Sequence, residues 1–104
     1  MARKPKTGPA SDPEMLIMAS LASGPRHGYG IMTDVEAFAG VTLGPGTLYT
    51  AITRLVERKF ITPLAASGRQ RPYKLTAQGA AALEQQLDGM RRVASVGLRR
   101  LKPA

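Results

Sequence analysis

The chain has 104 residues, with 15 lysines and arginines, 7 aspartates and glutamates, one histidine and no cysteine. This length predicts one domain with a small core, and the absence of cysteine excludes a disulfide framework and a thiolate zinc site. The sequence contains no serine–histidine–aspartate arrangement, phosphate-binding glycine loop or metal-ligand spacing, so we expect no catalytic residues, no metal and no cofactor. The formal net charge of +8 favours a polyanionic partner.

The N-terminal segment combines a basic arm with a helix start. Residues 1–11 are basic, contain proline and glycine and lack apolar periodicity, so we expect a disordered basic arm. Asp12, Pro13 and Glu14 then supply an N-cap, a first-turn proline and a charge that suits the helix dipole. Together they predict a first helix that runs to about Ala22.

The same segment superficially resembles a secretory signal. Its apolar run is shorter than the about 7–15 residues that such signals need. No run in the sequence approaches the roughly 20 apolar residues of a membrane-spanning helix. We therefore expect a cytoplasmic protein with no membrane contact.

The first and last predicted helices carry the residues expected at a dimer interface. The first is apolar on nearly all sides, and a helix of this kind needs cover on several sides, which predicts a second subunit. The last is capped by Thr76, and its apolar residues recur at steps of three and four, close to a heptad seam. The predicted homodimer interface consists of Met15, Ile17, Met18, Leu21, Leu83, Leu87, Met90, Ala94 and Leu98.

A second helix is predicted over roughly residues 27–39. Ile31, Val35 and Phe38 recur on one face, which we expect to be buried. Gly40 fits the C-cap of this helix.

Residues 45–61 predict a third helix with a polar face suited to DNA. Pro45 favours the first turn, where its missing N–H would have no partner. Apolar residues at helical spacing form one stripe, namely Leu48, Ala51, Ile52, Leu55 and Val56. The opposite side carries hydroxyls and guanidiniums, which can reach phosphate oxygens and base edges. Taken alone, this segment is equally compatible with an ordinary solvated helix face.

A hairpin with a basic tip follows directly. Residues 61–64 and 73–75 are short runs rich in branched and aromatic side chains, and Ser67-Gly68 predict the turn between them. Pro63 cannot donate to a sheet ladder, so its strand should lie at an edge or kink there. A helix followed by such a hairpin is the layout of a winged helix-turn-helix.

These elements predict a mainly α fold with a small β-hairpin. Residues 12–76 would form a winged helix-turn-helix DNA-binding domain, and residues 77–104 a long C-terminal dimerisation helix. No second domain and no internal repeat is expected.

Three segments resemble the PadR family of transcriptional regulators. They are GPRHGYGI at residues 24–31, LGPGTLYTAITRL at residues 43–55 and GRQRPYKLTAQG at residues 68–79. The resemblance covers about residues 14–101 and extends to the order and spacing of the three segments. It implies a dimeric winged-helix DNA-binding regulator, usually a repressor of a neighbouring gene, whose C-terminal helix builds the dimer. Some members of this family release DNA when phenolic or drug-like molecules bind.

Three positions depart from the family pattern. Gly30 stands where an acidic residue is usual, and Gly44 replaces a polar N-cap, at a cost of only a few tenths of a kcal/mol. Lys59 replaces a glycine that usually ends the third helix, and a left-handed lysine costs roughly 1–2 kcal/mol.

The polar helix, the hairpin and the resemblance together predict the DNA-binding residues. They are Thr47, Tyr49, Thr50, Thr53, Arg54, Arg69, Arg71, Lys74, Tyr29 and His27. We expect Tyr49 to reach a phosphate and the threonines and Arg54 to face base edges. A solvated hairpin tip and a structural role for His27 are the alternatives there. We interpret the arginine-rich residues 91–102 as a solvated helix end.

The predicted function is a sequence-specific DNA-binding transcriptional regulator, a repressor that binds a pseudo-palindromic operator as a homodimer. The alternatives are a winged-helix protein-interaction module and a non-specific nucleic-acid-binding protein. An inducer has no support in the sequence, because the first and last helices carry no aromatic residue. A cavity there would be lined by Met15, Met18, Met90 and Ala94, which also suit a fully packed interface. We therefore expect no tight binding of planar aromatic drugs.

Overall fold

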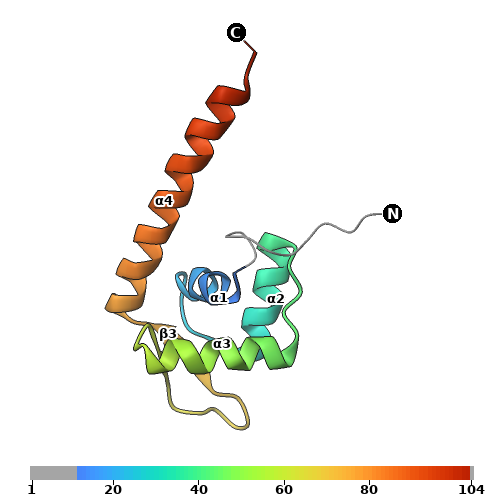
Figure 1. Ribbon diagram of the computed structural model, residues 1–104. Coiled ribbons are helices and arrows are strands. Elements are labelled where there is room, and N and C mark those ends of the chain that lie inside the picture. The colour runs from blue at the N-terminus through green and yellow to red at the C-terminus, as the bar shows by residue number, and fades with distance from the viewer. Residues whose placement is uncertain (1–11, 104) are drawn as a thin grey trace.

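The computed structural model describes residues 12–103, which form four helices and three short strands (Figure 1). In chain order these are α1 (Pro13–Leu21), β1 (Arg26–His27), α2 (Gly28–Ala39), α3 (Pro45–Glu57), β2 (Ile61–Pro63), β3 (Pro72–Leu75) and α4 (Ala77–Leu101). Helices α1, α2 and α3 pack together, α4 extends away from them, and the β2–β3 hairpin projects beyond α3 (Figure 1). The predicted fold class is confirmed. The predicted basic arm at residues 1–11 lies outside the described residues.

The helices begin where local sequence signals predict. The Asp12 carboxylate accepts a hydrogen bond from the Glu14 amide at 3.1 Å, and the Thr76 hydroxyl accepts one from the Gly79 amide at 3.0 Å. Both side chains are N-caps, of α1 and α4 respectively. Helix α3 begins at Pro45 without a side-chain cap, because glycine precedes it.

The sheet has three antiparallel strands in the order β1-β3-β2. Arg26 pairs with Tyr73 on one side of β3, and Ile61 pairs with Leu75 on the other. Pro63 lies on the edge strand β2, as predicted. The sequence did not predict β1, because a strand of two residues is too short to show alternation.

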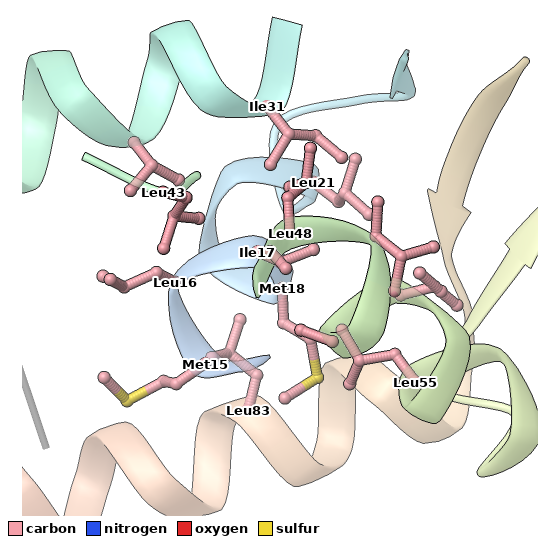
Figure 2. Close-up of a cluster of buried hydrophobic side chains, with 14 residues drawn as sticks. Met15, Leu16, Ile17, Met18, Leu21, Ile31, Leu43, Leu48, Leu55 and Leu83 are labelled. Carbon is pink, nitrogen blue, oxygen red and sulfur yellow. The ribbon is translucent and has the colours of Figure 1, made fainter. Parts of the chain in front are cut away.

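The core lies around α1, which is covered entirely within this chain. Helix α1 contacts α2, α3, α4 and β3, and Ile17, Met18 and Leu21 are at most 2% exposed. Leu83 reaches from α4 into the same cluster (Figure 2). The inference that a second subunit must cover α1 is therefore wrong. Ile17, Met18, Leu21 and Leu83, all predicted at the dimer interface, instead belong to the core of the subunit itself.

The exposed position of Phe38 also differs from the prediction. Ile31 and Val35 are fully buried, but Phe38 is 52% exposed. The buried stripe of α2 continues from Val35 to Ala39, one turn later, which packs against the core. Phe38 therefore lies at the edge of the buried stripe.

The Thr76 hydroxyl and Gly79 attach the start of α4 to the turn that follows α3. Lys59 adopts the left-handed conformation, with φ 65°, in place of the glycine usual at this position, so the helix end keeps this backbone geometry despite its cost. The Thr76 hydroxyl lies 2.7 Å from the Lys59 carbonyl oxygen and 3.0 Å from that of Phe60. A β-carbon on Gly79 would overlap the Phe60 carbonyl oxygen, so the start of α4 packs directly on this turn. Within residues 12–103 no helix is both long and apolar enough to cross a membrane.

Candidate nucleic-acid interface

Helix α3 presents its polar side to solvent. Its apolar stripe is buried at Leu48, Ala51, Ile52 and Leu55. The five α3 residues predicted to contact DNA are all exposed, namely Thr47, Tyr49, Thr50, Thr53 and Arg54. At 3.6 residues per turn, Thr50 and Thr53 lie near the middle of this exposed face, with Tyr49 and Arg54 toward opposite edges.

The hydroxyl proton of Thr53 is already used in a hydrogen bond within α3. Its hydroxyl donates to the Tyr49 carbonyl oxygen at 2.8 Å, one turn earlier in the same helix. The oxygen lone pairs of Thr53 remain, so its hydroxyl can accept a hydrogen bond from outside the helix. Such an acceptor suits an exocyclic amino group of adenine or cytosine in the major groove.

The Tyr49 edge of α3 borders a cleft of about 290 Å³ between α2, α3 and the hairpin, which we call the tyrosine cleft. It brings together five of the predicted DNA-binding residues from three separate parts of the chain. Its lining consists of His27, Gly28, Tyr29, Tyr49, Arg69, Gln70, Arg71 and Tyr73. Gly28, Gln70 and Tyr73 were not predicted as site residues, because the pairing of β1 with β3 brings them here.

The start of α2 forms one wall of the tyrosine cleft. A β-carbon on Gly28 would overlap the Tyr49 hydroxyl and approach its ring carbon Cε1 to 3.3 Å. Glycine at this position therefore lets the Tyr49 phenol lie against the first turn of α2. The free amides of a helix N-terminus, a phenol donor and nearby guanidiniums together favour an anion such as a phosphate.

His27 has a structural role at this helix start. Its Nδ1 accepts a hydrogen bond from the Gly30 amide at 3.3 Å, which makes His27 the N-cap of α2. With Nδ1 acting as an acceptor, the ring proton of the neutral side chain lies on Nε2. His27 thus lines the cleft while it caps the helix.

The hairpin carries Arg69 at its tip. Ser67 and Gln70 exchange backbone hydrogen bonds of 2.7 and 3.1 Å, so the turn is centred on Gly68 and Arg69 rather than on the predicted Ser67-Gly68. Gly68 adopts φ 63°, which glycine tolerates without strain. Arg71 donates from Nη1 to the Leu64 carbonyl oxygen at 3.1 Å and so braces the hairpin.

Lys74 is separated from the other predicted residues of the hairpin. It is exposed and pairs with Thr62 of β2. Its neighbour Tyr73 lines the tyrosine cleft. Because successive side chains of a strand point to opposite faces, Lys74 lies on the other face of the sheet.

The Arg54 edge of α3 borders a second groove, of about 410 Å³, against the first turn of α1. Glu14 of that turn accepts a hydrogen bond from Arg58 Nη1 at 2.7 Å, and its other oxygen lies 4.0 Å from Arg54 Nη1. The Glu14 side chain is 19% exposed, whereas those of Arg54 and Arg58 are 63% and 58% exposed. The sequence predicted only a helix-start role for Glu14.

A third and larger groove, of about 730 Å³, lies between α1 and α4. Met15, Met90 and Ala94 line it as predicted, but Met18 does not, because it is buried in the core. The other lining residues are Asp12, Gln85, Gln86, Gly89, Arg92 and Val93. Farther along α4, apolar side chains face solvent, with Leu98 65% and Leu101 81% exposed.

Comparison with solved structures identifies the same fold in known regulators. A PadR family transcription regulator from Clostridium difficile R20291 superposes with a TM-score of 0.77 at 24% identity, over 86% of this chain and 98% of that one. A PadR-like transcriptional regulator from Bacillus cereus ATCC 14579 gives a TM-score of 0.77 at 18% identity, over 88% and 92%. At these identities the likeness concerns the fold alone.

Sequence comparison identifies the family. The chain is 43% identical over 83 residues to an uncharacterized 37.1 kDa protein in transposon TN4556 of Streptomyces fradiae, and these residues are 80% of this chain. The match spans only 24% of that longer protein. The sequence profile of the transcriptional regulator PadR-like family matches residues 17–85. The chain therefore belongs to the PadR-like family of transcriptional regulators, which are DNA-binding regulators and not enzymes.

Proposed function

We propose that this chain binds a pseudo-palindromic operator in the cytoplasm as a homodimer and represses the gene under that operator. The observation that carries the proposal is the continuity of α3 with the tyrosine cleft, because Tyr49 belongs to both. With α3 in the major groove, a strand of the DNA backbone would follow the cleft. The major groove of B-form DNA is about 12 Å wide and admits one helix.

The proposed contacts fall into two groups. Thr47, Thr50, Thr53 and Arg54 would face base edges from α3. Tyr29, Tyr49, Arg69 and Arg71 would hold phosphates in or beside the cleft, where the α2 amides and the guanidiniums favour anions. Contacts of the first group specify sequence, and those of the second group fix the position of the protein on the duplex.

The proposed dimer uses the apolar side chains that the subunit leaves uncovered. Leu87 is 43% exposed and Leu98 is 65% exposed. Met15, Met90 and Ala94 line the groove beside them. A two-fold pairing of α4 helices would bury Leu87 and Leu98, cover this groove and relate two α3 helices by a dyad. The operator would then contain half-sites about one helical turn apart, roughly 10 base pairs, or a multiple of this spacing.

The sequence preference can be tested by selection from a random duplex pool. We expect the purified protein to enrich one pseudo-palindromic sequence and an excess of unrelated duplex to compete poorly for it. Arg54→Ala or Thr50→Ala should then change the preferred bases, at about 1–3 kcal/mol for a good base contact. Equal competition by unrelated duplex would indicate a non-specific nucleic-acid-binding protein. No duplex binding at all would favour a protein-interaction module.

Repression can be tested with the selected sequence placed inside a promoter that drives a reporter gene. A dimer bound there occupies the surface that polymerase needs, so reporter expression should fall when the protein is produced. A promoter with the half-sites scrambled is the control. A rise in expression that depends on the intact half-sites would identify an activator instead.

A further inference from the structure

Arg54 of α3 and Arg58, the C-cap residue of that helix, share one carboxylate that comes from a different helix. Glu14 lies in the first turn of α1, 44 positions before Arg58 in the sequence, and receives its hydrogen bond at 2.7 Å. The second carboxylate oxygen of Glu14 lies 4.0 Å from Arg54 Nη1. One carboxylate thus faces both guanidiniums, and the shorter contact is a charge-assisted hydrogen bond.

The setting of this carboxylate separates it from an ordinary surface ion pair. The Glu14 side chain is only 19% exposed, so solvent and salt reach this carboxylate less than they reach the guanidiniums of Arg54 and Arg58, which are 63% and 58% exposed. Glu14 also follows Asp12, whose carboxylate caps α1 and lines the same groove. Two acids therefore border the Arg54 edge of α3.

The opposite edge of α3 has the reverse character. Arg69, Arg71 and the start of α2 meet there in the tyrosine cleft. The charge across α3 is therefore asymmetric, because cations predominate at the Tyr49 edge, whereas at the Arg54 edge Asp12 and Glu14 offset the charges of Arg54 and Arg58. An unpaired arginine on the second edge would bind the phosphates of any duplex, because phosphate contacts carry no sequence information.

We propose that Glu14 is a specificity-determining residue of the DNA-binding surface, an inference that rests on the proposed function above. Paired with Glu14, Arg58 is withheld from phosphates. Arg54, held at 4.0 Å by one nitrogen, keeps its other nitrogens free for a base edge. A phosphate that approached either arginine would also meet the negative charge of Glu14, whereas a guanine edge carries no net charge and can accept a bidentate contact from the free nitrogens of Arg54. Glu14 thus weakens binding to non-cognate DNA more than binding to the operator.

The test is Glu14→Gln, which removes the charge and preserves the shape of the side chain. Affinity for unrelated duplex should rise by about tenfold at 0.1 M salt, since each newly engaged phosphate contributes roughly a factor of eight there. The slope of log affinity against log salt should steepen by about 0.9 per arginine released. Affinity for the selected operator should change less, so the specificity ratio should fall.

Glu84→Gln is the matched control. Glu84 is exposed on α4, and its substitution changes the net charge by the same amount. It should shift operator and unrelated duplex equally and by little. The double variant Glu14→Gln/Arg58→Gln should return the salt slope toward that of the unmutated protein, because the released cation is no longer present.

Arg58→Gln tests the same inference without altering α1. Because Arg58 is paired with Glu14, its loss should leave the salt slope and the specificity ratio unchanged. A slope flattened by about 0.9 would show that Arg58 engages a phosphate in the unmutated protein and would overturn the inference. An unchanged ratio and slope for folded Glu14→Gln would overturn it equally. If the unmutated protein does not distinguish duplexes, the proposed function fails and the inference fails with it.

Discussion

The Tyr49 hydroxyl lies so close to Gly28 that a β-carbon on this residue would overlap it. This close approach places the Tyr49 ring of α3 directly against the first turn of α2. It also explains why the glycine of the HGY segment is needed at this position. In the proposed complex with DNA, the first turn of α2 and the Tyr49 phenol could approach the same phosphate, because Gly28 leaves room for the ring.

Tyr49→Phe should weaken binding to every duplex by about 1.5 kcal/mol or more, the usual loss for a hydrogen bond to a charged group. Sequence preference should stay the same, because a phosphate contact does not read bases. Fluorescence anisotropy with the selected operator and an unrelated duplex measures both effects. Gly28→Ala should weaken both duplexes further, since the added methyl group displaces the ring as well as the hydroxyl. A changed base preference in Tyr49→Phe would show that the hydroxyl contacts a base.

Arg69→Ala and Arg71→Ala should differ in their effects on the fold. Both should reduce the slope of log affinity against log salt by about 0.9 if each guanidinium engages one phosphate. Only Arg71 also donates to the Leu64 carbonyl oxygen, so only Arg71→Ala should loosen the hairpin. Amide hydrogen exchange of residues 64–72 separates the two effects. An unchanged salt slope in the Arg69/Arg71 double variant would remove the hairpin from the DNA contact.

Leu87→Lys should give a folded monomer. Leu87 is 43% exposed in the subunit, so a lysine there costs little within one chain but places an unpaired charge in the proposed dimer interface. Ile17→Lys is the contrasting variant and should unfold the chain, because Ile17 is fully buried in the subunit core. Light scattering coupled to size exclusion, with circular dichroism, distinguishes these outcomes. A monomeric unmutated protein would refute the dimer itself.

Lys59→Gly should raise the free energy of unfolding by about 1 kcal/mol. The substitution relieves a left-handed lysine, which costs roughly 1–2 kcal/mol, but gives the unfolded chain more conformational freedom. Gly79→Ala should have the opposite effect, because its methyl group would overlap the Phe60 carbonyl oxygen. Urea unfolding measures both variants. A destabilised Lys59→Gly would mean that the lysine side chain makes a contact worth more than the backbone strain.

Planar aromatic drugs should not bind tightly to the groove between α1 and α4. Its lining contains methionine, valine and alanine but no aromatic ring that could stack on such a ligand. We expect calorimetry to show no micromolar binding and no release of DNA. A micromolar dissociation constant accompanied by DNA release would show that methionine alone suffices for this kind of recognition.

The sequence predicted those parts of the fold that depend on neighbouring residues. Asp12, Thr76 and Gly40 each act as the predicted cap, because a cap requires only a side chain or a backbone angle next to the helix. The exposed face of α3 was also predictable from helical periodicity alone. Its contact with DNA stays a prediction.

The features that the sequence did not predict depend on distant residues. The apolar α1 suggested a second subunit, whereas α2, α3 and α4 of the same chain cover it. The pair of Glu14 with Arg58 joins residues 44 positions apart, and no local pattern marks it. Strand β1 has two residues, too few for any periodicity. In each case the outcome was decided by how the helices pack and not by the residues of one segment.

The hydrogen bonds around Thr76 have a geometric consequence for the proposed dimer. They fix the direction in which α4 leaves the turn at Lys59 and Phe60. Helix α4 has 25 residues and is therefore about 37 Å long. A tilt of about 10° at its first turn would move its C-terminal end by about 6 Å. In a dimer joined through α4, this angle sets the separation of the two α3 helices. In the proposed dimer, the spacing between half-sites would thus depend on the hydrogen bonds of Thr76, which lies apart from the residues proposed to face base edges.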